Sequence, residues 1–224
     1  MRSMAVETLA FIVHNLPAIG ERTIEHVSIV SVAVGIAILT GVPLGIAITQ
    51  SQRAADTVLY LGSIVMTIPS IALFGVLIPL LSKIGQGIGY LPAVIAAMLY
   101  AQLPIVRNTY TAIRNVDPAL RSAAIGMGMS TWQRLLRVEI PIALPVIIAG
   151  IRVAVVINIG VTAIAAYIGA GGLGTFISRG ISQTDIRQLI TGALALALLA
   201  IVADYALLGL QRRLTPKGVA PRAA

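Results

Sequence analysis

Long apolar stretches with very few charged positions recur along the chain. A helix needs about 20 mostly apolar residues to span the hydrocarbon core of a membrane, and each of five stretches is about that long. The first two contain 23 and 25 residues without a charge, and the last two contain one charge each. The pattern therefore predicts five transmembrane helices, over residues 27–49, 57–81, 91–110, 142–168 and 188–211.

The N-terminal residues have a different pattern, in which apolar positions recur at helical spacing among polar ones. Ala5, Leu9, Ile12 and Leu16 share one face of a helix. Such a segment favours a helix that lies on the membrane surface. We therefore expect three regions: an amphipathic segment over 1–26, a transmembrane domain over 27–211 and a basic cytoplasmic tail over 212–224.

Composition agrees with a membrane protein and excludes several other classes. Hydrophobic residues make up 58% of the 224 residues and charged residues 11%, whereas about a quarter of a soluble domain is charged. The chain has no cysteine and two histidines, which excludes disulfides, thiolate metal sites and thiol catalysis and makes any metal site unexpected. The net charge of +8 would suggest nucleic-acid binding in a soluble protein. Here we expect no nucleic-acid partner and interpret the charge as a topology signal.

The lysines and arginines predict the orientation, because cytoplasmic loops retain them. Five spans divide the connecting segments into two sets. Segments 49–56, 107–141 and 211–224 carry ten of these residues, and the N-terminal segment with 82–90 and 169–187 carries five. We therefore expect an extracytoplasmic N-terminus and a cytoplasmic C-terminus.

The longest cytoplasmic segment, at about 111–141, has the end signals of two short helices. Asp117 followed by Pro118 is typical of an N-cap and a first helical position. Ser130 and Gln133 have the spacing of a capping box and predict a second helix. The second helix would present Trp132, Leu135 and Leu136 among Arg134 and Arg137.

From the residues alone, this helix-turn-helix could receive a partner protein or be only a well-capped connector between spans. A DNA-reading motif is disfavoured, because two adjacent membrane spans leave little room for a recognition helix to project into a groove.

Seven positions of the loop have a regular spacing: Ser122, Ala123, Ala124, Gly128, Val138, Ile140 and Pro141. They resemble the cytoplasmic signature of permease subunits of bacterial ATP-binding-cassette importers, which is Glu-Ala-Ala, three residues, Gly, nine residues, Ile, one residue, Leu-Pro. The spacing is kept, with serine in place of the glutamate and similar apolar residues at two positions. The resemblance implies that these residues, with Asp117, Pro118, Trp132 and Arg134, contact an ATPase.

Three further stretches extend the resemblance over most of the chain: 67–74 with Pro69, 103–110, and 168–174. They are similar to the permeases that import glycine betaine, choline, carnitine and related osmoprotectants. A methionine-type permease shares the last stretch, so an amino-acid importer stays open as an alternative.

The resemblance also implies an architecture and partners. The fold would be that of a binding-protein-dependent importer permease, all-α, in the bacterial inner membrane. It would work by alternating access as a homo- or heterodimer of permease subunits, with ATPase subunits that bind ATP and Mg²⁺ and with an extracytoplasmic substrate-binding protein. The chain itself would need no cofactor.

ATP hydrolysis by this chain alone is excluded. A phosphate-binding loop needs a lysine between glycine and Ser or Thr, and neither Lys83 nor Lys217 stands in such a sequence. We therefore expect a transport subunit and not an enzyme.

A glycine-rich stretch follows the fourth predicted span. Gly169, Gly171 and Gly174 match the spacing of a dinucleotide-binding loop, but a predicted membrane helix precedes them where that loop needs a strand. Together with Gly172, and with Pro69 in the second span, we interpret these residues as backbone breaks at the transport pathway or its gate. A plain loop is the alternative.

Arg152 and Asp204 are charged residues that lie away from the ends of the predicted spans. Arg152 lies seven residues from Pro145 and Asp204 lies seven residues from Gln211, so each is roughly 10 Å in from the inner surface. Equal depth allows an ion pair, either as a fixed structural contact or as part of a gate, and the arginine could instead reach the interface.

Two other classes of membrane protein fit less well. An ion-coupled secondary transporter would normally show internal repeats and more intramembrane carboxylates than Asp204. A membrane-embedded enzyme would need a cluster of catalytic side chains at one depth.

Overall fold

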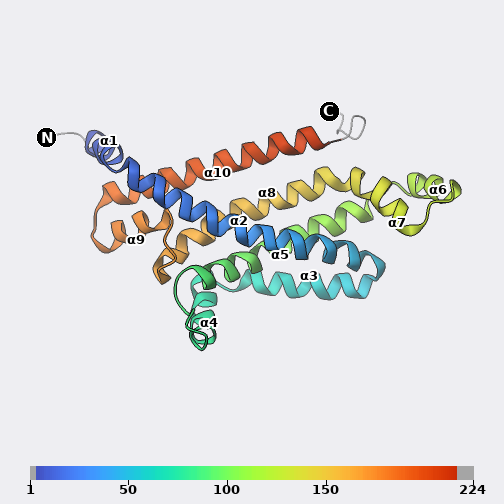
Figure 1. Cartoon of the computed structure of the whole chain (residues 1–224), viewed down its shortest axis with the longest axis horizontal. Helices are drawn as coiled ribbons and strands as arrows, with labels where there is room; N and C mark the ends of the chain where they lie inside the picture. Colours follow the sequence, from blue (N-terminus) through green and yellow to red (C-terminus); the bar gives the residue numbers. More distant parts are fainter. Residues whose placement is uncertain (1–3, 216–224) are drawn as a thin grey trace.

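The computed structural model describes residues 4–215, and every regular element in that range is a helix (Figure 1). The all-α class expected from the sequence is confirmed. Most turns are α-helical; η1 and η3 are 3₁₀ turns and η2 is a π-helical turn. The elements are α1 (Met4–His14), α2 (Leu16–Ala47), η1 (Ile48–Gln50), α3 (Gln52–Thr67), α4 (Ser70–Ser82), α5 (Tyr90–Arg114), α6 (Pro118–Gly126), α7 (Thr131–Arg134), η2 (Leu135–Glu139), α8 (Ile140–Ala165), η3 (Ala166–Ile168), α9 (Gly174–Ser182) and α10 (Ile186–Leu214).

Helices α2 and α5 pack closely because each presents a buried row of mostly small side chains spaced four residues apart. Rows with this spacing interdigitate when two helices cross, and small residues let membrane helices approach each other. A Cβ atom on Gly45 would lie 2.7 Å from the Cβ of Thr109, so only glycine fits there. The row on α2 is Ile29, Ala33, Ala37, Gly41 and Gly45, and the row on α5 is Ala93, Ala97, Ala101, Ile105 and Thr109.

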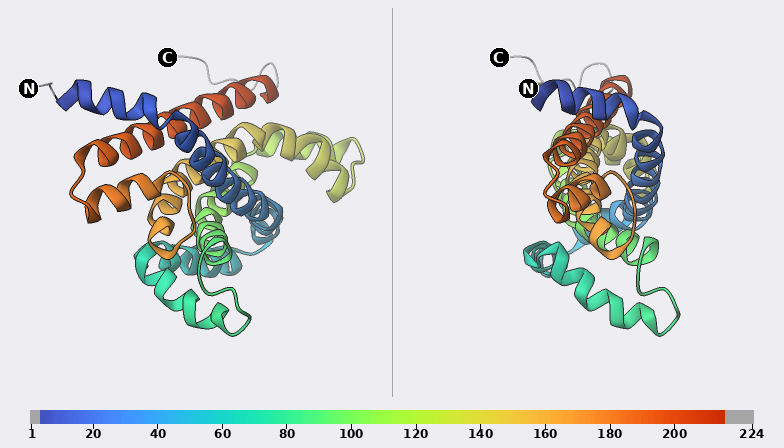
Figure 2. Two further views of the ribbon diagram at one scale, coloured as in Figure 1. Left: turned by 60° about the vertical axis from the view of Figure 1, so that its left-hand side comes forward. Right: turned by 90° about the vertical axis from the view of Figure 1, so that its left-hand side faces the viewer.

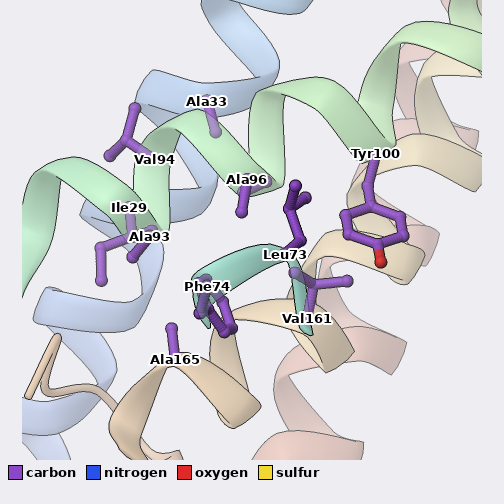
Figure 3. Packing of buried hydrophobic residues seen from close by; sticks show 11 residues of the cluster. Ile29, Ala33, Leu73, Phe74, Ala93, Val94, Ala96, Tyr100, Val161 and Ala165 are labelled. Carbon is purple, nitrogen blue, oxygen red and sulfur yellow. The ribbon is translucent and has the colours of Figure 1, made fainter. Parts of the chain in front are cut away.

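Helix α8 completes the core by packing against both α5 and α2. A Cβ on Gly150 would lie 2.5 Å from the Cβ of Asn108 on α5, so the glycine allows this close approach. Figure 3 shows the part of the core around Phe74 of α4, whose side chain points into the space between α5 and α8. The three long helices and the start of α4 therefore share one apolar core.

The second predicted span is bent. Helices α3 and α4 meet at 97° across Ile68 and Pro69. Proline has no amide to donate to the helical ladder, and the carbonyl of Ile68 instead accepts a hydrogen bond from the hydroxyl of Tyr100. Figure 2 shows α4 turned away from the bundle. Among the described residues, four helices are long and apolar enough to cross a membrane, and the bent pair makes a fifth if it is one span.

The N-terminal segment is divided differently from the prediction. Helix α1 ends at His14, and α2 begins at Leu16 with Pro17 in its first turn. Residues 16–26 therefore belong to the first long helix, whereas α1 packs beside α10. Residues 1–3 and 216–224 lie outside the described range, so most of the tail expected over 212–224 is not described.

Candidate functional site

The first half of the loop over residues 111–141 is a capped helix. The Oδ1 atom of Asp117 accepts a hydrogen bond from the Ala119 amide at 2.8 Å, and Pro118 occupies the first turn of α6. The helix ends at Gly126. Gly128 follows with φ of +78°, a left-handed conformation that strains other L-residues. The turn predicted between the two short helices therefore forms at Gly128, where glycine adopts the left-handed conformation.

The helix in the second half of the loop begins at the predicted capping box, but it does not end before the next span. Ser130 and Gln133 form a capping box, with reciprocal hydrogen bonds of 3.3 and 3.0 Å. Helix α7 then continues through η2, α8 and η3 as one helix of 38 residues from Thr131 to Ile168. The π-helical turn lies directly before Pro141, where the missing amide disrupts the tighter ladder.

A buried carboxylate holds the loop together. Glu139 is 5% exposed, and its Oε1 accepts a hydrogen bond from Nε of Arg134 at 2.7 Å. Nε of Arg121 on α6 lies 3.6 Å from the same oxygen, and Arg121 also donates to the carbonyl of Ile113 at the end of α5. These contacts join α5, α6 and η2. The loop signature does not include Glu139, although this carboxylate follows Arg134 and Arg137 closely in a segment with few carboxylates.

The outer surface of the loop is apolar. Trp132 is 66% exposed, and four other large apolar side chains are exposed with it. Ser122 and Ala123 of the signature are exposed, whereas Ala124 is buried and Val138, Ile140 and Pro141 are half-buried. Several exposed apolar groups within one short loop indicate a surface for a partner. The four other side chains are Leu120, Ile125, Met127 and Leu136.

The glycine-rich stretch forms a turn that α2 holds. Gly169, Gly171 and Gly172 all have φ between +76° and +78°. The Gly172 amide donates to Oε2 of Glu25 at 2.8 Å, and Arg22 pairs with the same carboxylate at 2.8 Å.

The turn is also packed against its neighbours. The ring of fully buried His26 lies against Gly172, and the Gly89 amide donates to the carbonyl of Ile168 at 2.9 Å. Gly174 begins α9 in close contact with the backbone of Ala163. The preceding element is the helix α8 and η3, so the strand that a dinucleotide-binding loop needs is not at this position.

The two charged residues of the spans lie together. Arg152 on α8 donates to both carboxylate oxygens of Asp204 on α10, at 2.8 and 2.9 Å from Nη2. Its Nη1 donates to Oε1 of Gln211 at 2.9 Å, and Nε2 of Gln211 donates to the carbonyl of Pro145 at 2.9 Å. Gln211 was not among the residues singled out from the sequence, although it lies seven residues after Asp204 and so on the same face.

These groups do not form one site. The loop over residues 111–141 and the glycine turn lie at opposite ends of the molecule, with the long helix from Thr131 to Ile168 between them (Figure 1). The ion pair lies along that helix, and Pro69 lies at the bend of α3 and α4. Within residues 4–215, no group of three or more His, Asp or Glu side chains is placed to hold a metal ion.

Residues 37–217 match the protein family described as binding-protein-dependent transport system inner membrane component. The chain is 56% identical to the osmoprotectant import permease protein OsmW of Salmonella typhimurium, over 96% of this chain and all of that protein. It is 41% identical to the glycine betaine/carnitine/choline transport system permease protein OpuCB of Bacillus subtilis, over 88% of this chain and 89% of that one.

The fold matches a solved structure. A chain of the MetNI methionine ABC transporter in an inward-facing conformation superposes with a TM-score of 0.81, at 22% identity, over 88% of this chain and 96% of that one. This likeness concerns the fold. Together with the sequence matches and the apolar helices, it leads to one conclusion: the chain belongs to the family of multi-pass inner membrane components of binding-protein-dependent transport systems.

Proposed function

We propose that this chain is the membrane-spanning subunit of an ATP-driven importer for quaternary-amine osmoprotectants such as glycine betaine, choline or carnitine. The observation that carries the proposal is the 56% identity to a permease named for osmoprotectant import, over nearly the whole chain. The likeness to a methionine transporter is at the level of fold, so it gives no comparable support to the amino-acid alternative.

The assembly that fits this function has two permease subunits, two ATPase subunits that bind ATP and Mg²⁺, and a substrate-binding protein outside. The ATPases would dock on the exposed apolar surface around Trp132. The excess of lysine and arginine on the segments at that end supports a cytoplasmic loop and C-terminus, with the N-terminus outside.

The proposed mechanism transmits movement of the ATPases along one rigid element. The contacts of Glu139 fasten the loop to η2, and η2 continues into α8 without a break. At about 1.5 Å per residue, a helix of this length reaches across a membrane. The glycine turn follows the far end of this helix. A displacement of the loop by the ATPases would therefore also displace the glycine turn, and this movement would open the pathway by alternating access.

Uptake into vesicles tests the proposal. The complex of this chain with its ATPase and binding protein is reconstituted, and uptake of radiolabelled glycine betaine, choline and methionine is measured with ATP and with ionophores present. We expect ATP-dependent uptake of a quaternary amine. Uptake of methionine alone would establish the amino-acid alternative, and ATP-independent uptake abolished by ionophores would establish an ion-coupled transporter.

A cysteine-labelling experiment tests the orientation. A single cysteine replaces Ser130, which is exposed in the loop, in a chain that has no cysteine of its own. We expect labelling by a membrane-impermeant reagent in inside-out vesicles and none in intact cells with a permeable outer layer. Labelling of intact cells would place the loop outside and overturn the docking assignment.

A further inference from the structure

The ion pair between α8 and α10 opens onto a hollow. The hollow has a volume of about 450 Å³, within the usual range for small-molecule pockets. Its walls are aliphatic apart from the two charged residues. It is lined by Ala149, Arg152, Val153, Val156, Ile157 and Asp204.

The charges reach the surface of the hollow. The side chain of Arg152 is 21% exposed and that of Asp204 is 37% exposed. Val153 and Val156 beside them are also exposed. Charged groups inside a membrane usually face a cavity or a partner, because the hydrocarbon phase does not solvate them. An exposed ion pair on this face therefore indicates that the hollow meets water or a polar ligand and not lipid tails.

Both members of the ion pair can form further hydrogen bonds to a ligand. Among the described residues, the hydrogen bonds of Arg152 to Asp204 and Gln211 leave one hydrogen of Nη1 without a partner. Oδ2 of Asp204 accepts a single hydrogen bond, although a carboxylate oxygen has two lone pairs. The site can therefore receive a negative group at Arg152 and a positive group at Asp204 without losing the contact between them.

We infer that this hollow is a weak binding site on the transport pathway for quaternary amines. The inference rests on the proposed function and identifies where the cargo is held inside the membrane. A trimethylammonium group is large and weakly hydrated, so it packs against aliphatic walls while its charge is balanced by Asp204. The carboxylate of a zwitterion such as glycine betaine binds Arg152. Tight sites for such cations use aromatic rings, and aliphatic walls give the weaker hold that lets a cargo leave.

The two sides of α8 provide an internal comparison. Val156 lines the hollow with the ion pair, whereas its neighbour Val155 lines a separate apolar groove of about 380 Å³ between α2, α8 and α10. Adjacent valines at nearly the same depth thus face two different environments.

Thiol labelling of the assembled transporter tests the site. The chain has no cysteine, so Val156→Cys and the matched control Val155→Cys each add one thiol, and intact mass spectrometry of this chain reports its modification. Thiolates react and thiols in apolar surroundings do not, so we expect Val156→Cys to be modified by methanethiosulfonates about tenfold or more faster than Val155→Cys. Equal rates would overturn the inference.

The occupant is tested in the same experiment, with the trimethylammonium methanethiosulfonate as the reagent. Millimolar glycine betaine should slow its reaction with Val156→Cys, and the same concentration of sucrose should not. A thiol that glycine betaine does not protect would show a water-filled space without a binding site.

A neutral variant separates binding from structure. Arg152→Gln with Asp204→Asn keeps hydrogen-bonding groups at both positions and leaves no unpaired charge. In the Val156→Cys background we expect it to purify as a complex and to lose protection by glycine betaine. Retained protection would assign the pair a purely structural role. These outcomes do not depend on uptake, so a wild-type complex that imports no quaternary amine would refute the proposed function separately.

Discussion

At the residue scale, Glu139 shows how one carboxylate can set the shape of a surface. It is buried, and it lies between Arg134 on α7 and Arg121 on α6. The arginines are partly exposed, so water solvates them in part, but the carboxylate has little water of its own. Local spacing in the sequence could not reveal this, because the contact between Arg121 and Glu139 depends on how the turn at Gly128 folds back.

Replacing Glu139 tests its role as the fastener of the loop. Glu139→Ala removes the acceptor of the Arg134 hydrogen bond and the counter-charge of Arg121. Because hydrogen bonds to charged groups contribute about 1.5–3 kcal/mol, we expect the free energy of unfolding to fall by about 2 kcal/mol. Thermal unfolding of the purified chain in detergent measures this. The control is Glu21→Ala, an exposed carboxylate, whose loss should change stability by less than about 0.5 kcal/mol. Equal effects of the two substitutions would contradict the assignment.

The ion pair of Arg152 and Asp204 makes a prediction about pairs of substitutions. Removing one partner leaves a charge at membrane depth without its counter-ion, whereas removing both leaves none. We therefore expect Arg152→Ala and Asp204→Ala each to reduce the yield of folded protein, and the double variant to recover part of it. Fluorescence-detected size-exclusion chromatography gives the yields. A double variant no better folded than the worse single variant would show that the two charges are not coupled.

At the element scale, the crossing of α2 and α5 depends on side-chain size. The row of small residues on α2 allows close contact, and Gly45 is the position where a methyl group would meet both Thr109 and the backbone of Val106. The sequence indicates this contact through the spacing of Gly41 and Gly45, which is typical of helix packing in membranes. The sequence does not identify α5 as the partner helix, because any of the other membrane helices could pack against a face of small residues.

Alanine at two glycines of α2 tests this packing. Gly45→Ala inserts a Cβ 2.7 Å from the Cβ of Thr109, and overpacking of this kind usually costs about 1–3 kcal/mol. Gly35→Ala in the same helix meets nothing within 4 Å and should be neutral or stabilise by up to about 1 kcal/mol, because alanine favours helices. Thermal unfolding of both variants should separate them in opposite directions. Equal destabilisation would indicate that glycine acts through helix flexibility.

The elements that differ from the sequence prediction differ for identifiable reasons. Charges over residues 16–26 suggest that the first span starts later, but Arg22 pairs with Glu25, and Glu25 accepts from the Gly172 amide. That contact joins residues 147 positions apart, so no local pattern contains it. Pro141 suggests a new start for the fourth span, yet the wider turn of η2 lets the helix continue.

At the scale of the whole molecule, one helix connects the two ends at which the sequence predicts a coupling loop and a gate. The exposed apolar loop lies at one end, the glycine turn lies at the other, and one helix connects them (Figure 1). The loop residues, the glycines and the ion pair could all be identified from the sequence, because each has a local signature. Their arrangement along a single helix could not, since it requires knowing that α7 and α8 are continuous.

The exposed Trp132 gives the sharpest test of the whole assembly. Its side chain is 66% exposed, so Trp132→Ala should leave the stability of this chain nearly unchanged. If the loop receives the ATPase, a central tryptophan is a typical hot spot, and its loss should weaken binding about thirtyfold or more. Tyr205→Ala on α10 is the control, because Tyr205 is 69% exposed but far from the loop in the chain. Surface plasmon resonance with the ATPase subunit compares the two dissociation constants. Normal ATPase affinity in Trp132→Ala would move the docking surface away from α7 and leave the loop as a connector between spans.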